Sequence, residues 1–433
     1  MQPYARLVLA TLALATGCGR IGFDGLDAPG TGGDDAAPAD GDSGATVYGD
    51  FVDPMAWTSF DTTTVAPGAG GYVGAAFDGR YLYLVPSYIG GFTGLVTRHD
   101  THGELADPTS WSTFDTSTMN PAARGYNGGA FDGRYVYFIP HENPGGYTGL
   151  ISRYDTQQAF SAPAAWSTFD IKMLAAAAVG FVGARFDGRY LYLMPYVTTM
   201  MARYDTQAPF ASPSSWSTFD LASVAATVPG FVGGAFDGRY LYFVPFLDTA
   251  ASGRIMRYDT QASLTAAGSW TTFDTTTVTA NAKGFCGAGY DGRYVYLVPF
   301  FSAQGVASGL VTRYDTQAVF TSTAAWSTFD VSTIDPQAKG FFGATFDGRH
   351  IYLASYPTGK LVRYDTSATF ASAGAWRVFD ATTVDAKASA FYGAAFDGGA
   401  VYFIPHGAST IARFAAKSPP AMPVLPGFFG SFL

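Results

Sequence analysis

Four short runs of aromatic, aliphatic and β-branched residues follow one another in a fixed order along this chain, and turn residues separate them. In one stretch they read WSTFD (166–170), FVGARF (181–186), YLYLMP (190–195) and MMARYD (200–205). Runs of this kind, bounded by Gly, Asp and Pro, predict β-strands. The third run is apolar at nearly every position, as in a strand that is buried on both faces. The Asp-Gly pair before it predicts a tight hairpin turn.

The same four runs occur seven times between residues 57 and 414, at intervals of 50 to 56 residues. A repeat of this length with four strands is typical of a propeller blade, so the sequence predicts an all-β, seven-bladed β-propeller of four-stranded blades. The chain ends its last repeat with a TIARF run at 410–414 and has no Trp run after it. We expect the first Trp run, at 57–61, to complete this last blade and close the ring, which removes exposed strand edges. An open solenoid is the alternative, but it would lack capping units.

The order of the runs, with an aromatic-Asp strand before a Trp strand, resembles kelch repeats over residues 57–414. The resemblance implies that the GAAFD-type run is innermost in each blade and the WSTFD-type run outermost. The glycine pair that kelch repeats carry after the second strand is replaced here by Pro and an aromatic residue, as in Pro195–Tyr196, and the connector from the Tyr to the Trp is longer. The resemblance therefore extends to the blade architecture and not to a kelch function.

The repeats differ in length at one place only. From the Pro that ends the third run (Ser355 in the sixth repeat) to the Arg of the fourth run, the interval is 12, 13, 8, 12, 14, 8 and 8 residues along the chain. In a four-stranded meander this variable loop leaves the blade at the same end as the connector to the next blade, and the Asp-Gly turns lie at the other end. We call these two ends the variable face and the turn face. Variable loops on a rigid scaffold commonly carry binding sites, so we expect a ligand site on the variable face, around the axis.

Residues that break the sevenfold pattern are the candidate ligand contacts, because the Arg and Asp residues that recur in almost every repeat are more simply explained as scaffold. Arg185 lies in the innermost run, where the other repeats have Ala, Gly or Thr. It would reach a ligand carboxylate or phosphate, or alternatively pair with a carboxylate of a neighbouring blade. Three cations share the position just before the inner run, and they favour an anionic ligand unless they are simply solvated: Arg124, Lys283 and Lys339. Six rings follow the Pro position, where they would either stack on a ligand or cap the blades: His141, Tyr196, Phe246, Phe300, Tyr356 and His406.

No catalytic residue, cofactor or metal site is predicted. The chain has no HExxH, GxSxG or glycine-rich phosphate loop. Among its five histidines, His141 has one close carboxylate, that of Glu142, which is too few ligands for a metal site. An enzyme of the lyase or hydrolase type remains an alternative, and it requires Arg185, His141, Glu142 and His406 to lie together. A purely structural envelope protein is a second alternative.

The two ends of the chain indicate where it works. Residues 1–17 have the Arg, the apolar run and the small residues of a secretory signal. The LATGC stretch resembles a bacterial lipobox, which implies cleavage before Cys18, acylation of its thiol and an outer-membrane address. Residues 18–50 read as a flexible acidic tether rich in Gly, Asp, Ala and Pro, 51–414 as the propeller and 415–433 as a Pro-rich tail.

The sequence therefore predicts an exported, lipid-anchored, non-enzymatic binding protein of the bacterial outer membrane. We expect it to be monomeric and to recognise a glycan, peptide or protein on its variable face. With a net charge of −9, the chain is not expected to bind nucleic acid, since phosphate binding needs clustered Lys and Arg.

Overall fold

The structure is a computed structural model that describes residues 45–247, 250–303, 305–356, 358–425 and 431–432, the last pair by its backbone only. The predicted signal segment 1–17, the predicted lipidation site Cys18 and most of the predicted tether lie outside the described residues. The described part contains β-strands and 3-10 turns of three residues each, and no α-helix.

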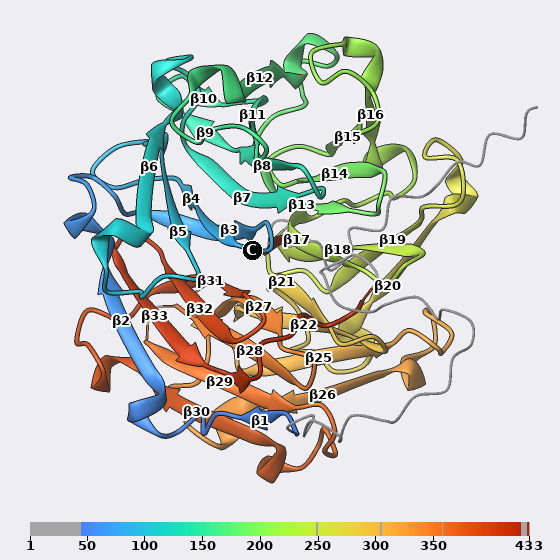
Figure 1. Ribbon diagram of the computed structural model, residues 1–433. Helices are drawn as coiled ribbons and strands as arrows, with labels where there is room; N and C mark the ends of the chain where they lie inside the picture. The colour runs from blue at the N-terminus through green and yellow to red at the C-terminus, as the bar shows by residue number, and fades with distance from the viewer. Residues whose placement is uncertain (1–44, 248–249, 304, 357, 426–430, 433) are drawn as a thin grey trace, which may run out of the picture. The chain divides into compact units, whose positions relative to one another are not determined.

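Seven antiparallel sheets stand around a common axis, so the predicted all-β, seven-bladed propeller of four-stranded blades is confirmed (Figure 1). In blades 1 to 6 the strands run in chain order from the innermost to the outermost. The strands of blades 1 to 3 are β3 (Tyr72–Phe77), β4 (Tyr81–Pro86), β5 (Leu95–Asp100) and β6 (Trp111–Asp115); β7 (Tyr126–Phe131), β8 (Tyr135–Pro140), β11 (Leu150–Asp155) and β12 (Trp166–Asp170); and β13 (Phe181–Phe186), β14 (Tyr190–Pro195), β15 (Met200–Asp205) and β16 (Trp216–Asp220).

Blades 4 to 7 repeat the arrangement. Their strands are β17 (Gly230–Phe236), β18 (Tyr240–Leu247), β19 (Arg254–Asp259) and β20 (Trp270–Asp274); β21 (Phe285–Tyr290), β22 (Tyr294–Pro299), β25 (Leu310–Asp315) and β26 (Trp326–Asp330); β27 (Phe341–Phe346), β28 (His350–Ser355), β29 (Lys360–Asp365) and β30 (Trp376–Asp380); and β31 (Phe391–Phe396), β32 (Ala400–Pro405), β33 (Thr410–Ala415) and β2 (Trp57–Asp61).

Each outermost Trp strand lies between two 3-10 turns. The turns before these strands are η1 (Pro54–Ala56), η3 (Pro108–Ser110), η5 (Pro163–Ala165), η7 (Pro213–Ser215), η9 (Ala267–Ser269), η11 (Thr323–Ala325) and η13 (Ala373–Ala375). The turns after them are η2 (Thr62–Thr64), η4 (Thr116–Thr118), η6 (Ile171–Met173), η8 (Leu221–Ser223), η10 (Thr275–Thr277), η12 (Val331–Thr333) and η14 (Ala381–Thr383). In each of the second group, the Asp that ends the Trp strand accepts a hydrogen bond from the backbone two residues on, so this recurring Asp is a cap.

The ring closes as predicted. β2 pairs with β33 in continuous antiparallel register, from Trp57 opposite Phe414 to Asp61 opposite Thr410. The innermost strands contact one another around the axis, and the circle includes the contact of β3 with β31 between the first and last blades. Blade 7 is therefore built from both ends of the propeller sequence.

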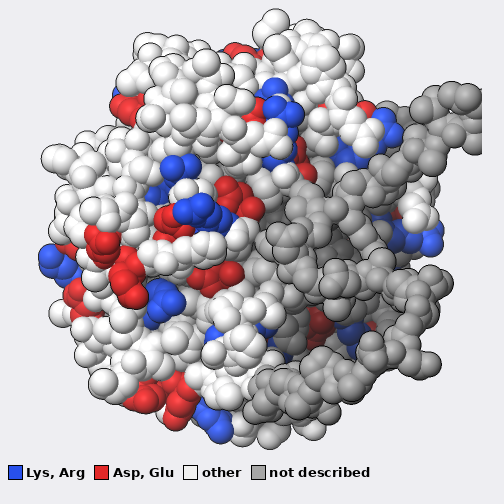
Figure 2. Space-filling model, viewed as in Figure 1, with Lys and Arg blue, Asp and Glu red and all other residues white. Residues whose placement is uncertain are grey.

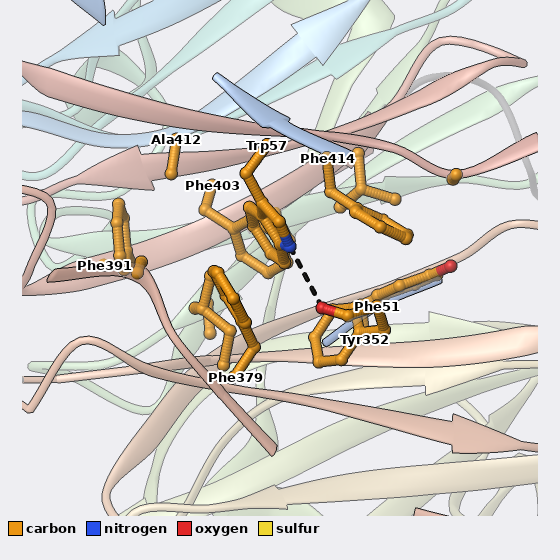
Figure 3. Packing of buried hydrophobic residues seen from close by; sticks show 14 of the residues in the cluster. Phe51, Trp57, Tyr352, Phe379, Phe391, Phe403, Ala412 and Phe414 are labelled. Carbon is orange, nitrogen blue, oxygen red and sulfur yellow. Dashed lines mark hydrogen bonds between the residues drawn. The ribbon is translucent and has the colours of Figure 1, made fainter. Parts of the chain in front are cut away.

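Seven stacked Trp–Phe pairs join the outer parts of the blades into a second closed circle. Each Trp stacks on the Phe of the WSTFD-type strand of the preceding blade, with ring centroids 4.3 to 5.6 Å apart: Phe60–Trp111, Phe114–Trp166, Phe169–Trp216, Phe219–Trp270, Phe273–Trp326, Phe329–Trp376 and Phe379–Trp57. The last pair crosses from blade 6 to blade 7. In Figure 3 the Trp57 indole lies among Phe379, Phe403 and Phe414 and donates a hydrogen bond to the Phe51 carbonyl at 3.0 Å.

The other recurring charges are also scaffold. The Asp of each FDG turn accepts hydrogen bonds from the turn backbone and from a buried Tyr hydroxyl; for Asp78 these come from Arg80 N, Tyr81 N and Tyr83 Oη. Six blades repeat the ion pair of Arg80 with Asp100 at 2.7 Å across the turn face. The guanidinium of Arg98 and its equivalents lies over aromatic rings instead.

The tail packs on the turn face and ends in the channel. β34 (Lys417–Ser418) pairs with β1 (Val47–Tyr48), so ordered structure extends beyond the 51–414 range at both ends. The chain then passes close to the turn glycines of blades 7, 6 and 5, at Gly398, Gly348 and Gly292. β35 (Ser431–Phe432) adds to the free edge of β3 and contacts the inner strands β7, β13, β27 and β31, so it lies in the channel.

Charged side chains on the face seen in Figure 2 lie in small mixed groups of both signs, outside the area drawn in grey. This agrees with the Arg–Asp pairing of the turns. None of the helices in the described part of the chain has the length and hydropathy of a membrane span.

Candidate functional site

The variable loops carry extra structure where they are long. The loop of blade 2 forms the hairpin β9 (Glu142–Asn143) with β10 (Gly146–Tyr147), and the loop of blade 5 forms β23 (Phe301–Ala303) with β24 (Val306–Ala307). Isolated bridges lie in the long loops of blades 1 and 4. Two tyrosines on these loops, Tyr88 and Tyr147, are each 49% exposed, whereas the rest of the described tyrosines are at least partly covered.

The six predicted rings come together at the variable-face end of the channel. A chain of ring contacts, with centroids 3.7 to 6.2 Å apart, passes from blade 2 to blade 7: His141–Tyr196, Tyr196–Phe246, Phe246–Phe300, Phe300–Phe342, Phe342–Tyr392 and Tyr392–His406. Tyr356 contacts the last two members of this chain. Together with Tyr356 these residues form what we call the mouth ring. Phe246 and Phe300 are only 8% and 7% exposed, so this side of the ring packs against itself.

The mouth ring becomes polar at blade 2. At the second position of the inner strand, Asn127 stands where the other blades have Val73, Val182, Val232, Cys286, Phe342 and Tyr392. Asn127 Oδ1 and His141 Nδ1 are buried and have no hydrogen-bond partner in the described part of the chain. Burial lowers the pKa of His141 to about 4, so the imidazole is neutral at pH 7. We call this pair the blade-2 gap, because the equivalent pair in blade 7, Tyr392 and His406, is a closed stack at 3.7 Å.

The three cations that precede the inner strands lie on blades 2, 5 and 6. Lys283 lines a shallow open cavity of about 210 Å³ between blades 4 and 5, with Arg254 and Asp274 among the other lining residues. Arg124, Lys283 and Lys339 are half-buried and form no ion pair within the described residues. Their convergence on one anionic ligand stays a prediction.

Arg185 lies deeper, in the inner strand of blade 3. Its side chain is 8% exposed, and its guanidinium donates one hydrogen bond, from Nη1 to Ala184 O at 2.7 Å. No ion pair joins Arg185 to a carboxylate among the residues that the structure describes. Burial lowers the pKa of Arg185 to about 10.

The residues of the enzyme alternative are not joined. No described contact links Arg185, His141 or His406 to one another: His406 lies on blade 7 with Nδ1 3.3 Å from Tyr72 O, whereas His141 lies on blade 2 against Tyr147 and Tyr196. Within the described residues, no group of three His, Cys, Asp or Glu side chains has a metal-binding arrangement.

Sequence reasoning missed two polar positions. Asn127 stands in a column of mostly apolar residues in the aligned repeats, and Thr345 is one of the small residues equivalent to Arg185. Thr345 is 3% exposed and its Oγ1 is buried without a hydrogen-bond partner in the described chain. The signal was present in both cases, as a polar residue in an apolar column of the aligned repeats.

No protein-family model matches this chain, and no curated protein matches it in sequence. Solved structures match over most of the propeller. Virginiamycin B lyase from Staphylococcus aureus is 12% identical over 83% of this chain and 98% of its own, with a TM-score of 0.57. YCF48 bound to D1 peptide is 13% identical over 86% of this chain and 97% of its own, with a TM-score of 0.54. The Pan2 WD40 domain from Neurospora crassa is 10% identical over 85% and 97%, also with a TM-score of 0.54.

These structures show the propeller fold alone. Their names include a lyase, a protein bound to a peptide and a WD40 domain, so the shared architecture accommodates unrelated activities. The function of this chain has to be argued from its own site.

Proposed function

We propose that this protein is a non-enzymatic binding protein that recognises a glycan, peptide or protein on its variable face. The observation that carries the proposal is the pairing of exposed rings with unsatisfied polar groups beside the blade-2 gap. Tyr147, 49% exposed, contacts the His141 imidazole at 5.6 Å, and Tyr88, on the neighbouring blade, is equally exposed and contacts Phe92 at 5.3 Å.

This arrangement is suited to recognition. Tyr rings offer apolar area with a polar tip at little cost in side-chain entropy. Asn127 Oδ1 and His141 Nδ1 have no hydrogen-bond partner among the described residues, and polar groups in an otherwise apolar mouth favour specific recognition. The rigid ring of blades holds both loops in place, so little order has to be created on binding.

The test combines a glycan array with pull-down from envelope extract, using the soluble head. We expect the double variant Tyr88→Ala/Tyr147→Ala to lose the signals that the wild-type head gives. The control is Met55→Ala, because Met55 is 89% exposed on the turn face. Equal binding by the double variant and the wild type would place recognition elsewhere. A folded wild-type head that gives no signal in either assay would favour the purely structural alternative.

We further propose that the head is a monomer held at the outer membrane by a lipid on Cys18. The lipobox-like LATGC stretch supports this, and the acidic segment after it has the composition of a flexible spacer. Fractionation of cells that express the wild type or Cys18→Ala tests it. The wild type is expected in the membrane fraction and the variant in the soluble fraction; recovery of both in the soluble fraction would contradict the anchor.

A further inference from the structure

Blade 7 departs from the other blades at its turn. In blades 1 to 6 an Arg after the FDG turn pairs with the Asp that ends the third strand, as Arg80 does with Asp100. Blade 7 has Gly399 and Ala415 at these two positions, and Ala400 stands where the other blades have Tyr or His. The sequence of blade 7 therefore lacks the three side chains that cover the turns of the other blades.

The end of the chain lies on this uncovered turn. We call residues 417–425 the strap, because they pass close to the turn glycines of blades 7, 6 and 5. Lys417 N donates a hydrogen bond to Gly399 O at 3.0 Å, and Ala421 N donates one to Gly398 O at 2.8 Å. The strap is therefore hydrogen-bonded to the backbone of the turn.

The missing side chains make room for the strap. A Cβ added at Gly399 would lie 3.3 Å from Pro420 Cγ, and one at Gly398 would lie 3.6 Å from Met422 Sδ. The first distance is already shorter than the optimal separation of two carbon atoms. The longer side chain that Gly399→Arg introduces would therefore compete with Pro420 for the same space. The departure of blade 7 from the repeat and the seating of the strap thus belong together.

The strap also makes apolar contacts across several blades. Met422 packs against the hydrophobic cluster between blades 6 and 7 and against the one between blades 7 and 1, and Leu425 packs against the cluster between blades 5 and 6. At the other end, Lys417 Nζ donates to Asp347 O at 2.6 Å and lies 5.2 Å from the centre of the Phe396 ring. The strap sequence, KSPPAMPVL, therefore fits this surface as an extended segment with a cation before two apolar side chains.

These contacts hold the strap only weakly. Its side chains are exposed or half-buried, and that of Val424 is fully exposed. A hydrogen bond near the surface replaces one to water, so its net contribution to binding is small. The strap occupies this surface because it belongs to the same chain, which gives it a high effective concentration there.

We propose that the turn face of blade 7 is a peptide-binding site and that the strap is its autoinhibitory occupant. Release of the strap opens the surface to an extended, Pro-containing segment of another chain that carries a cation before two apolar side chains. Pro residues pre-organise such a segment in an extended conformation, which lowers the entropy lost on binding. This site lies on the face opposite the variable loops, so it goes beyond the proposed function and does not depend on it.

Two double variants release the strap in opposite ways. Gly399→Arg/Ala400→Tyr restores the turn of the other blades, so that the strap is displaced and the site is blocked. Ala421→Pro/Leu425→Asp removes one backbone donor and one apolar contact of the strap, so that the strap is displaced and the site stays open. The comparison of the two separates the site from its occupant.

Methionine oxidation by hydrogen peroxide, read by mass spectrometry, reports the position of the strap in the full head. Met422 is partly buried, whereas Met173 is 71% exposed and Met194 and Met256 are fully buried. We expect Met422 to react more slowly than Met173 in the wild type and at the same rate as Met173 in both variants. Protection of Met194 and Met256 in all three proteins shows that the propeller stays folded. If Met422 is as protected in both variants as in the wild type, the strap is not a releasable occupant and the proposal fails.

Fluorescence anisotropy of a labelled peptide with the strap sequence, KSPPAMPVL, then tests the site itself. We expect the peptide to bind Ala421→Pro/Leu425→Asp, and to bind the wild type and Gly399→Arg/Ala400→Tyr at least about tenfold more weakly. The strap fills the site in the wild type, and the new side chains fill it in the blocked variant. A peptide of the same composition in scrambled order is the control. Equal affinity for all three proteins, or no binding to Ala421→Pro/Leu425→Asp, would overturn the proposal. Neither outcome bears on recognition by the variable face, which the array and pull-down test.

Discussion

Ring closure predicts that a mutation at the end of the propeller sequence acts like one in its middle, and Trp57→Ala tests this against Trp216→Ala. The two sites are closely matched. Trp57 is 4% exposed, stacks on Phe379 at 4.3 Å and donates to a carbonyl six residues earlier at 3.0 Å; Trp216 is 6% exposed, stacks on Phe169 at 4.9 Å and makes the same bond at 2.9 Å.

Both variants are expected to lose the same free energy of unfolding. Truncation of a buried Trp to Ala costs about 3–5 kcal/mol. The carbonyl that loses the indole bond is left buried, and a typical hydrogen bond contributes about 1 kcal/mol. In a closed ring each blade packs on two others, so the whole propeller unfolds in one transition. The free energy lost by the substitution at either site therefore lowers the stability measured for that transition by its full amount. In an open array, the terminal strand β2 separates by itself, and Trp57→Ala leaves the main transition unchanged.

Urea unfolding followed by far-ultraviolet circular dichroism and by tryptophan fluorescence measures the two variants. Closure predicts coincident curves in the two probes and midpoints that fall equally. A third chain, without residues 51–61, lacks the closing strand and is expected to lose cooperative unfolding. The reasoning is refuted if Trp57→Ala and this deletion unfold at the wild-type midpoint while Trp216→Ala does not.

Three further predictions concern buried groups and the tail. Burial, reinforced by the charge of Arg413, lowers the pKa of His99 from 6.5 to about 4. The neutral ring therefore stabilises the fold above pH 6.5, and this stability, up to about 3 kcal/mol, is lost as the pH falls from 6.5 to 4. His99→Tyr, the residue of most other blades, should flatten the dependence of the unfolding free energy on pH in this range, and an unchanged slope would contradict the assignment. Removal of residues 426–433 takes β35 off the edge of β3, so hydrogen exchange of the β3 amides should become faster, whereas equal exchange would mean that the strand does not stay paired. Cys286 is fully buried, and burial raises the pKa of its thiol well above the usual value. In a Cys18→Ala chain, iodoacetamide should therefore label Cys286 only after unfolding. Labelling of the native chain would show that the mouth ring opens.

The architecture was predictable because the pattern that specifies it occurs seven times. A single FDG turn is a weak hairpin signal, but seven of them at constant distance from a Trp strand define a blade, and the unpaired Trp run at 57–61 then identifies the closing strand. The pairing of Val47–Tyr48 with Lys417–Ser418 and the addition of β35 to β3 were not predictable in this way. Each involves two residues from segments that do not repeat, and such short strands have no periodicity to read.

The geometry of the variable face was predictable from the sequence, and its chemistry less so. Length variation located the variable loops, and the residue after each Pro located the rings that the structure joins. Whether a polar group in such a column is satisfied depends on the packing around it. Asn127 and Thr345 could be seen as departures from the pattern, but only the coordinates show that Asn127 Oδ1 and Thr345 Oγ1 have no described partner. For Arg185 the sequence left open a carboxylate partner, which the inner strands do not contain.

Two of the departures from sevenfold symmetry, the polar pair of blade 2 and Arg185 of blade 3, lie on adjacent blades. His141 of the blade-2 gap lies against Gly180 and Phe181, at the start of the strand that carries Arg185. At about 3.3 Å per residue, Arg185 lies about 13 Å further along β13 than Phe181. Blades 4 to 7 line their side of the mouth with packed rings, whereas the polar pair of blade 2 lies next to the strand that carries Arg185. β35 pairs with Ala75 and Ala76 and contacts β13, so the last described strand of the chain itself lies beside the strand that carries Arg185.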